Sequence, residues 1–384
     1  MRCYFDHNAT TPVSPEAIEA MLPVLTESYG NASSIHHFGQ AAKQRLEIAR
    51  RQVARLLGAR KATEIVFVSG GTEADNLAIT GAVGASTRST KHVITSTIEH
   101  PAVLNVCREL EAEGVAVTYV GVGGSGVIDV RDVRRALRPD TVLISIMHAN
   151  NEVGTVQPVR EIAELARESG VLFHSDGVQA AGKLPLEDTG ADLYTVSGHK
   201  FGAPKGIGAL YVRDKVKLAP LMRGGKQERE RRPGTENVPG AVAMGRAAEW
   251  INSNFASETA RIAELRDRLE REILASVPHA RANCAASPRT PNTSNILFEG
   301  IEGEAMVIAL DLKGFAVSSG AACSSGAVEP SHVLTAVGLS KDDARSCIRF
   351  SLGRQNDEHQ VAALVEAVVA SAAHLRRLSP VAVG

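Results

Sequence analysis

The sequence lacks any apolar run that approaches the roughly 18 residues of a membrane-spanning helix. It also lacks an excess of charge of either sign, because 42 Lys and Arg stand against 43 Asp and Glu and the formal net charge is −1. Such a balance gives no electrostatic attraction to nucleic acid or to an anionic membrane. Near the N-terminus, the acidic Asp6 comes before any signal-peptide core. We therefore expect a cytoplasmic protein that binds small molecules or other proteins.

Cysteine is scarce and its spacing is uninformative. The five cysteines stand at positions 3, 107, 284, 323 and 347, an odd number with no Cys-X-X-Cys pair. This pattern argues against a disulfide framework and a zinc ribbon, and we expect no metal site. Four of these residues lie in apolar or strand-like surroundings and are interpreted as core residues. Cys323 differs, because it lies among serine, glycine and alanine.

Aromatic residues make up only 4% of the 384 residues, whereas hydrophobic residues make up 44%, so the core is expected to be aliphatic. Seven short β-rich runs alternate with helical patterns, at 64–68, 92–95, 115–120, 142–147, 171–174, 193–196 and 209–212. Such alternation favours parallel strands joined by helical crossovers. We predict an α/β domain of three layers around a seven-stranded, mainly parallel sheet.

The chain is longer than one hydrophobic core usually serves, so a second domain is expected. Further helical patterns lie at 15–29, 41–57, 237–274, 304–313 and 358–378, and further strand patterns at 295–298, 316–318 and 348–351. The long pattern that begins at 237 is interpreted as a helix that joins two domains. We predict a large cofactor-binding domain at 15–255 and a small α+β domain formed by 1–14 with 256–384.

Polar residues collect directly after five of the predicted strands, at 69–72, 99–100, 150–151, 176–179 and 197–200. In an open parallel sheet, ligands bind beyond the carboxyl ends of the strands, where helix N-termini direct free N–H groups at anions. Each cluster alone is weak evidence, since Ser-Gly-Gly-Thr at 69–72 is more often a plain turn than a phosphate cradle. Their shared position predicts one site.

Lys200 and Asp176 indicate the chemistry of this site. Lys200 follows an apolar strand, so partial desolvation is expected to lower its pKa and to free its amine for an aldehyde; the alternative is a surface lysine in a loop. Asp176 ends the adjacent strand, where a carboxylate is placed to pair with a protonated pyridine nitrogen. Pyridoxal phosphate requires this combination. His100 is interpreted either as a ring that stacks on the cofactor or as a core or capping histidine.

Two candidate residues lie in the predicted small domain. Cys323 belongs to the segment 318–326, whose small residues leave the sulfur unshielded, and its pKa is expected to start near the free value of ~8.5. Arg349, in the predicted strand 348–351, is placed either to bind a substrate carboxylate or to lie exposed on the strand. The segment 223–232 mixes charges of both signs and is interpreted as a solvated loop or as a subunit contact.

Nearly the whole chain resembles the cysteine desulfurases of the NifS/IscS-like branch of the class-V aminotransferases, which are fold-type I pyridoxal 5'-phosphate enzymes. The motifs that carry the resemblance lie at 6–12, 30–34, 69–73, 99–103, 149–155, 197–200, 234–237, 318–326, 329–333 and 348–354. The resemblance implies a homodimer that removes sulfur from L-cysteine and leaves L-alanine and a persulfide on Cys323. It also implies delivery of the sulfur to an iron–sulfur scaffold or another acceptor protein for cluster assembly. Departures are few: Cys347 stands where such sequences often have a hydroxyl residue, and Cys3 lies in the first strand.

The resemblance also implies roles for single residues. Lys200 would hold the cofactor and move protons, Cys323 would attack the substrate sulfur, and His100 would stack on the ring and exchange protons. Arg349 and Asn151 would bind the substrate carboxylate. The other cofactor-binding residues implied are Gly71, Thr72, Asn151, Asp176, Gln179, Ser197, His199 and Thr235, the last of which would come from the other subunit.

Three alternatives remain open at this point. Another fold-type I aminotransferase or lyase would need Lys200 and Asp176 but no cysteine segment. A selenocysteine lyase would have a shorter and more rigid segment around its cysteine. A non-catalytic subunit that kept the fold would typically have lost Lys200 or Cys323, and this chain has both.

Overall fold

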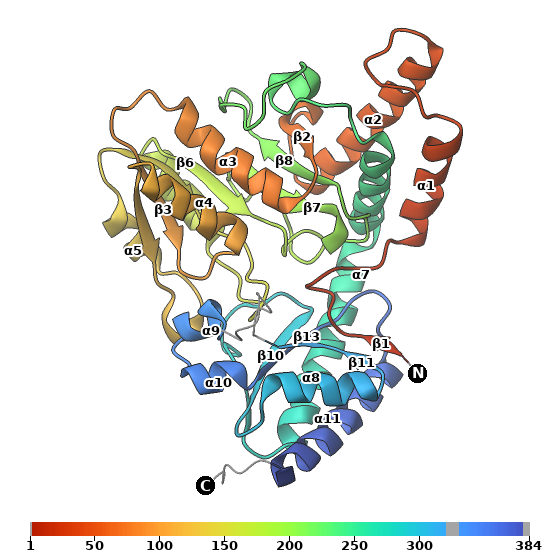
Figure 1. Cartoon of the computed structure of the whole chain (residues 1–384), viewed down its shortest axis with the longest axis vertical. Coiled ribbons are helices and arrows are strands. Elements are labelled where there is room, and N and C mark those ends of the chain that lie inside the picture. Colours follow the sequence, from red (N-terminus) through yellow and green to blue (C-terminus); the bar gives the residue numbers. More distant parts are fainter. Residues whose placement is uncertain (1, 320–329, 379–384) are drawn as a thin grey trace.

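The computed structural model describes residues 2–319 and 330–378, so Cys323 lies outside the described residues. The centre of the molecule is a seven-stranded sheet (Figure 1). From edge to edge its strands are β2 (Ile65–Val68), β8 (Gly208–Val212), β7 (Leu193–Ser197), β6 (Leu172–Asp176), β5 (Thr141–Ser145), β3 (His92–Ser96) and β4 (Ala116–Val120). The seven predicted strands and the mainly parallel sheet are confirmed, with bounds that shift by one or two residues.

Strand β8 is the exception to the parallel order. It runs antiparallel to both of its neighbours, β2 and β7, whereas β7, β6, β5, β3 and β4 pair in parallel. The simple alternation of strand and crossover helix is therefore wrong for this strand. The reason is the length of the connection 198–207, which is too short to hold a helical crossover, so the chain turns back on itself.

Helices cover both faces of the sheet. One face packs against α3 (Gly71–Ala85) and α4 (Pro101–Ala112), and the other packs against α2 (His37–Leu56), α5 (Val130–Ala136), α6 (Val159–Glu168) and the first half of α7 (Val238–Ser276). Strand β2 shows the alternation that this requires: Ile65 and Phe67 belong to the core with α2, while Val66 and Val68 belong to the core with α3. The sheet and the helices on its two faces form the three layers predicted from the sequence.

A second core lies below the sheet in Figure 1. Its four-stranded antiparallel sheet has the order β12 (Ser318–Ser319), β13 (Cys347–Ser351), β10 (Thr293–Phe298) and β9 (Ala280–Ala282), and a parallel pair joins β1 (Cys3–Tyr4) to β11 (Phe315–Ala316). The remaining helices are α1 (Pro15–Thr26), α8 (Gly303–Leu312), α9 (His332–Ala336), α10 (Lys341–Arg345) and α11 (Glu358–Leu378). A single strand at 316–318 is wrong, because Ala316 pairs with Tyr4 while Ser318 pairs with Arg349 in the other sheet.

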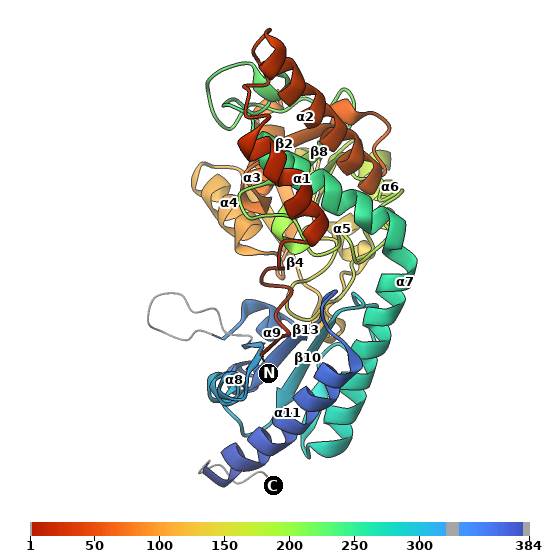
Figure 2. The same cartoon turned by 90° about the vertical axis from the view of Figure 1, so that its right-hand side faces the viewer.

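Helix α7 joins the two cores, as Figure 2 shows along its length. Its buried residues between Val238 and Ile251 pack under the seven-stranded sheet, whereas Leu265, Leu269 and Ile273 belong to the second core. The long joining helix predicted from the sequence is present. The predicted domain boundary at 255/256 falls inside this helix and stays a prediction.

The segment 223–232 is held to the large core by a buried ion pair. Arg50 on α2 donates from Nη1 and Nη2 to the Glu228 carboxylate at 2.6 and 2.8 Å, and both side chains are 3% exposed. Glu228, Arg229 and Glu230 have positive φ angles of 46°, 58° and 64°, a strained conformation for residues with a side chain. The interpretation as a solvated loop is therefore wrong for Glu228, and the subunit contact stays a prediction.

In the described part of the chain, no helix is both long and apolar enough to cross a membrane. Residues 2–319 and 330–378 also contain no cluster of three or more His, Cys, Asp or Glu side chains arranged to hold a metal ion.

Candidate active site

A cavity of about 400 Å³ opens at the carboxyl ends of β6 and β7, where loops from both cores meet. The predicted site residues that line it are Gly71, Thr72, His100, Asn151, Asp176, Gln179, Ser197, His199, Lys200 and Arg349. Thr235 is exposed and does not line it. A larger cavity of about 740 Å³ lies at the amino end of β7 and the carboxyl end of β8, around Tyr211 and Arg213, and contains none of the predicted residues.

Lys200 ends a single helical turn directly after β7, and its amine faces the N-terminal segment. The Nζ atom donates to the carbonyl oxygens of Asn8 and Ala9 at 2.6 and 2.8 Å. The pKa of Lys200 is lowered to about 8, first by burial and then by the positive charge of Arg349, while Asp176 and Asp6 oppose the shift. The neutral fraction at neutral pH is therefore larger than for an ordinary lysine, which makes this amine more reactive toward an aldehyde.

Asp176 is a buried carboxylate at the end of β6. Its Oδ1 atom accepts a hydrogen bond from the backbone N–H of Val178 at 2.9 Å. Burial raises the pKa of Asp176, whereas the charges of His100 and Lys200 lower it. A partly desolvated carboxylate is stabilised by a nearby positive charge, and a protonated ring nitrogen would provide that charge.

His100 caps the N-terminus of α4 and lines the same cavity. Its Nδ1 atom accepts from the backbone N–H of Ala102 at 3.1 Å, so a neutral ring carries its proton on Nε2. Burial lowers the pKa of His100. The capping interpretation is therefore correct, and stacking of the ring on the cofactor stays a prediction.

The N-terminus of α3 and the end of β7 together form an anion cradle. Gly70 and Gly71 begin α3 without a side-chain cap, which leaves the N–H groups of its first turn available to a ligand. A Cβ atom on Gly71 would lie 2.9 Å from a methyl carbon of Val178, so a larger residue does not fit. Ser197 and His199 line the cavity opposite this turn. Glu73, in the same turn, is neutralised by Arg232 at 2.8 Å.

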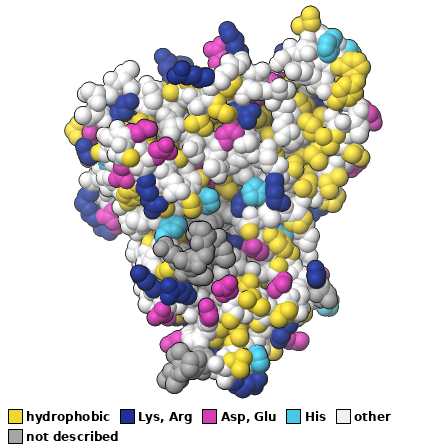
Figure 3. Space-filling view, viewed as in Figure 1, with side chains coloured by type: hydrophobic (Ala, Val, Ile, Leu, Met, Phe, Trp, Pro, Cys, Tyr) yellow, Lys and Arg dark blue, Asp and Glu magenta, His cyan; other side chains and the backbone are white. Residues whose placement is uncertain are grey.

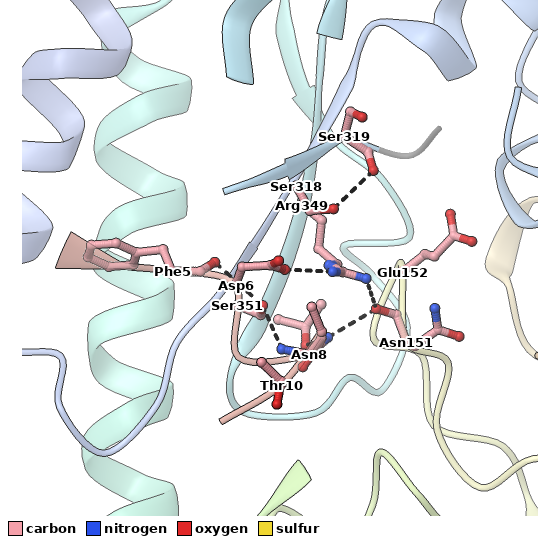
Figure 4. Close-up of polar contacts among 12 residues, drawn as sticks. Phe5, Asp6, Asn8, Thr10, Asn151, Glu152, Ser318, Ser319, Arg349 and Ser351 are labelled. Carbon is pink, nitrogen blue, oxygen red and sulfur yellow. Dashed lines mark hydrogen bonds and ion pairs between the residues drawn. The ribbon is translucent and has the colours of Figure 1, made fainter. Parts of the chain in front are cut away.

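Arg349 reaches the cavity from β13 in the second core. Figure 4 shows its guanidinium between Asp6 and Asn151: Nη2 contacts Asp6 Oδ1 at 2.6 Å, and Nη1 donates to the Asn151 carbonyl oxygen at 3.0 Å. Asn8 donates from Nδ2 to the same carbonyl oxygen at 3.1 Å. The exposed-strand interpretation of Arg349 is wrong, because the residue is 8% exposed.

Three residues that line the cavity, Asn8, Ala9 and Asp75, and one next to it, Asp6, received no role from the sequence. Asn8 and Ala9 supply backbone oxygens to Lys200, and Asp6 holds Arg349. Asp75 lines the cavity, is 1% exposed, and has a pKa raised well above its usual range by burial and by Asp176. Asp75 lies three positions after Thr72 on α3, a spacing that places both residues on one helix face. This spacing was the sequence signal from which Asp75 could have been predicted.

These groups fit pyridoxal phosphate. The cradle offers donors to a phosphate, Lys200 offers an amine to the aldehyde, and Asp176 offers a carboxylate to the ring nitrogen. The amides of Asn151 and Gln179 line the same cavity, and Gln179 is oriented by its Nε2 bond to the Asn8 carbonyl oxygen at 2.9 Å.

Comparison with known proteins supports the same cofactor assignment. The family model described as aminotransferase class-V matches residues 3–364. A cysteine desulfurase of Trichormus azollae is 49% identical over 98% of this chain and 94% of its own, and the cysteine desulfurase IscS of Methanosarcina thermophila is 46% identical over 98% of this chain and 93% of its own. A solved NifS-like protein superposes with a TM-score of 0.90 at 35% identity, over 98% of this chain and 100% of that one.

Proposed function

The chain belongs to the aminotransferase class-V family, and from this premise we propose that it acts as a cysteine desulfurase that holds pyridoxal phosphate in the cavity around Lys200. The family relationship confirms the resemblance, the fold class and the cofactor predicted from the sequence. The observation that carries the proposal is one cavity that joins the desolvated Lys200 amine, the buried Asp176 carboxylate and a helix N-terminus.

When bound, pyridoxal phosphate supplies an aldehyde for the amino group of cysteine and a ring that stabilises negative charge next to the substrate α-carbon. Asp176 keeps the ring nitrogen protonated, and the α3 cradle with Ser197 and His199 holds the phosphate. Lys200 would hold the cofactor in the resting enzyme and, as a neutral amine, would accept the α-proton of the substrate. The pKa of about 8 supports this role, because an amine near its ordinary pKa would be almost fully protonated at neutral pH.

Cys323 is the proposed nucleophile, on the strength of the sequence motif at 318–326. Its thiolate attacks the sulfur of the bound substrate, an S–S bond forms, and the Cβ–S bond breaks with its electron pair left on carbon. That carbon takes a proton and the product is alanine. His100 is the proposed proton partner in this step, since it lines the cavity with an Nε2 atom that is free of the cap.

We further propose that the working form is a homodimer. The first two helices and the segment between them carry a surface of exposed apolar side chains, named here the α1–α2 surface: Ile18, Leu22, Leu25, Tyr29, Ile35 and Phe38. Figure 3 shows hydrophobic side chains gathered on the side where α1 and α2 lie. Leu22 is 58% and Tyr29 69% exposed. A second copy of the chain that covers this surface removes it from water. In such a dimer, Thr235 completes the phosphate site of the neighbouring subunit.

The persulfide sulfur is proposed to pass to an acceptor protein, an iron–sulfur scaffold by analogy with the IscS relative. A reducing compartment such as the cytoplasm is proposed for this work. The support is that Cys3, Cys107, Cys284 and Cys347 are all free thiols.

The test is to incubate the purified holoenzyme with L-cysteine and a small thiol and to measure sulfide and alanine together. Equal amounts of both products are expected, and Lys200→Ala is expected to form neither. Pyruvate in place of alanine would identify a lyase instead.

A further inference from the structure

A carboxylate from the N-terminal segment reaches the edge of the proposed site. Asp6 follows β1, and its backbone forms an isolated bridge with Ser351 at the end of β13. Its Oδ1 atom lies 2.6 Å from Nη2 of Arg349, and the two side chains are 19% and 10% exposed. We propose that Asp6 is a positioning residue that orients the Arg349 guanidinium for the substrate carboxylate. The proposal rests on the proposed function.

The hydrogen bonds of Arg349 are the first support. Asp6 occupies Nη2 and the Asn151 carbonyl oxygen occupies Nη1, while the buried Nε atom has no hydrogen-bond partner within residues 2–319 and 330–378 (Figure 4). The guanidinium is planar and rigid, so two anchors fix the direction of the N–H groups that remain. Because Arg349 lines the cavity, those groups are available to an anion that enters it.

The rigidity of the anchors is the second support. The backbone N–H of Ser351 donates to the Phe5 carbonyl oxygen at 2.8 Å, and the N–H of His7 donates to the Ser351 carbonyl oxygen at 3.1 Å. Asp6 is thus fixed on both sides to the strand that carries Arg349, and a substrate carboxylate finds the fork already ordered. Without Asp6, substrate binding itself would have to order the long arginine side chain, which weakens binding.

The same carboxylate acts on Lys200. Arg349 lowers the pKa of Lys200, while Asp176 and Asp6 raise it, so removal of Asp6 leaves Asp176 alone to oppose the positive charge of Arg349 at the amine. The other titratable groups around this amine are Asp176, His100, His199 and Lys183. All of them remain in an Asp6 variant, so a change in the titration of Lys200 reports on Asp6.

The experiment compares the Asp6→Asn holoenzyme with the wild type in two ways. For cysteine, KM is expected to rise about tenfold, equivalent to ~1.4 kcal/mol, with a smaller change in kcat. For L-alanine, which has the carboxylate and the amine but no sulfur, the Kd measured from the visible absorbance of the bound cofactor is expected to rise by a similar factor. The alanine measurement tests Asp6 even where no desulfuration occurs, so failure of the proposed function and failure of this inference are distinguishable.

A third readout uses the cofactor-free protein. The rate at which it captures pyridoxal phosphate should rise with pH through the pKa of Lys200, with a midpoint at about 8 in the wild type and at a lower pH in Asp6→Asn. A role in folding alone would not move this midpoint.

Glu16→Gln is the matched control, because it breaks the paired 2.9 Å contacts between Arg354 and Glu16, which lie outside the cavity. It is expected to leave KM and the midpoint unchanged. Asp6→Glu keeps the negative charge but moves it by one methylene group, and is expected to give a KM between those of the wild type and Asp6→Asn. If Asp6→Asn does not fold, Asp6→Glu is measured in its place. An unchanged or lower Kd for alanine in a folded Asp6 variant, or an equal rise in Glu16→Gln, overturns the proposal.

Discussion

The amine of Lys200 donates to the backbone oxygen of Asn8 at 2.6 Å, so a residue from the first turn of the chain holds the side chain on which the proposed chemistry depends. Asn8 is itself fixed by the hydroxyl oxygens of Thr293 at 2.8 Å and Ser351 at 2.9 Å, which belong to the second core. The orientation of Lys200 is therefore set by an element that packs outside the sheet from which the lysine projects.

Reduction with borohydride should attach the cofactor permanently to Lys200. Lys183 is a stringent internal comparison, because burial lowers its pKa to about 7 and its amine donates to Gln179 Oε1 at 2.7 Å, yet it does not line the cavity. Peptide mapping of the reduced protein is expected to find the modification on Lys200. Modification of Lys183, or of neither lysine, would contradict the cofactor assignment.

Cys323→Ala should separate binding from sulfur transfer. The variant is expected to keep its visible absorbance and its spectral response to L-cysteine, but to form alanine at least about a hundredfold more slowly. Cys347→Ser is the control: Cys347 is buried, and burial raises its pKa to about 12, so its turnover should stay near that of the wild type. Near-normal alanine formation by Cys323→Ala would remove Cys323 from its role.

Glu99→Gln should change how stability depends on pH. Glu99 is buried, accepts from Ser96 Oγ at 2.5 Å and from the Met147 N–H at 3.0 Å, and has its pKa raised by burial to about 8. Between the usual value of 4.5 and about 8, the folded protein binds more protons at this group than the unfolded chain does. The contribution of Glu99 to the free energy of unfolding therefore falls as pH rises through this window.

The measurement is the thermal midpoint of variant and wild type at about pH 5 and about pH 8. The glutamine cannot ionise, so the midpoint of Glu99→Gln relative to the wild type should rise by about 2–4 °C or more between these conditions. Glu109→Gln, at an exposed position of α4, serves as the control and should show no such trend. A difference that is constant with pH would show that Glu99 does not titrate as inferred.

Leu22→Glu should disrupt the proposed dimer. Leu22 is exposed on the α1–α2 surface, and a buried charge at a subunit contact is costly. Light scattering coupled to gel filtration is expected to find monomers, and the variant should retain less cofactor if Thr235 acts across subunits. Leu312→Glu is the control, because Leu312 is 83% exposed on α8 and lies outside that surface. If Leu22→Glu remained a dimer, the subunit contact would lie elsewhere on the molecule.

The position of the site was predictable because parallel strands end at one edge. Ser197 and Asp176 end β7 and β6, Asn151 follows β5, and that rule alone brings them to one cavity. The helix start at Gly71 was visible as a run of small residues. These inferences needed only the local pattern and the direction of each strand.

The contributions of Asp6 and Asn8 were not predictable in the same way. Both depend on the path by which the N-terminal segment returns to pair with β11 and β13, residues more than three hundred positions away in the chain. The direction of β8 was likewise missed, because the strand pattern is the same in both directions and only the short connection 198–207 reveals the turn.

Helix α7 has a consequence for how the molecule unfolds. Its 39 residues span roughly 58 Å as one uninterrupted helix, and the two ends belong to different hydrophobic cores. If the second core melted alone, the latter half of α7 would lose the packing that stabilises it while remaining tethered to a folded half. Fraying would then spread along the helix toward Ile251 and the sheet. The shared helix thus makes the loss of either core costly to the other, and it favours a single cooperative transition over a stepwise one.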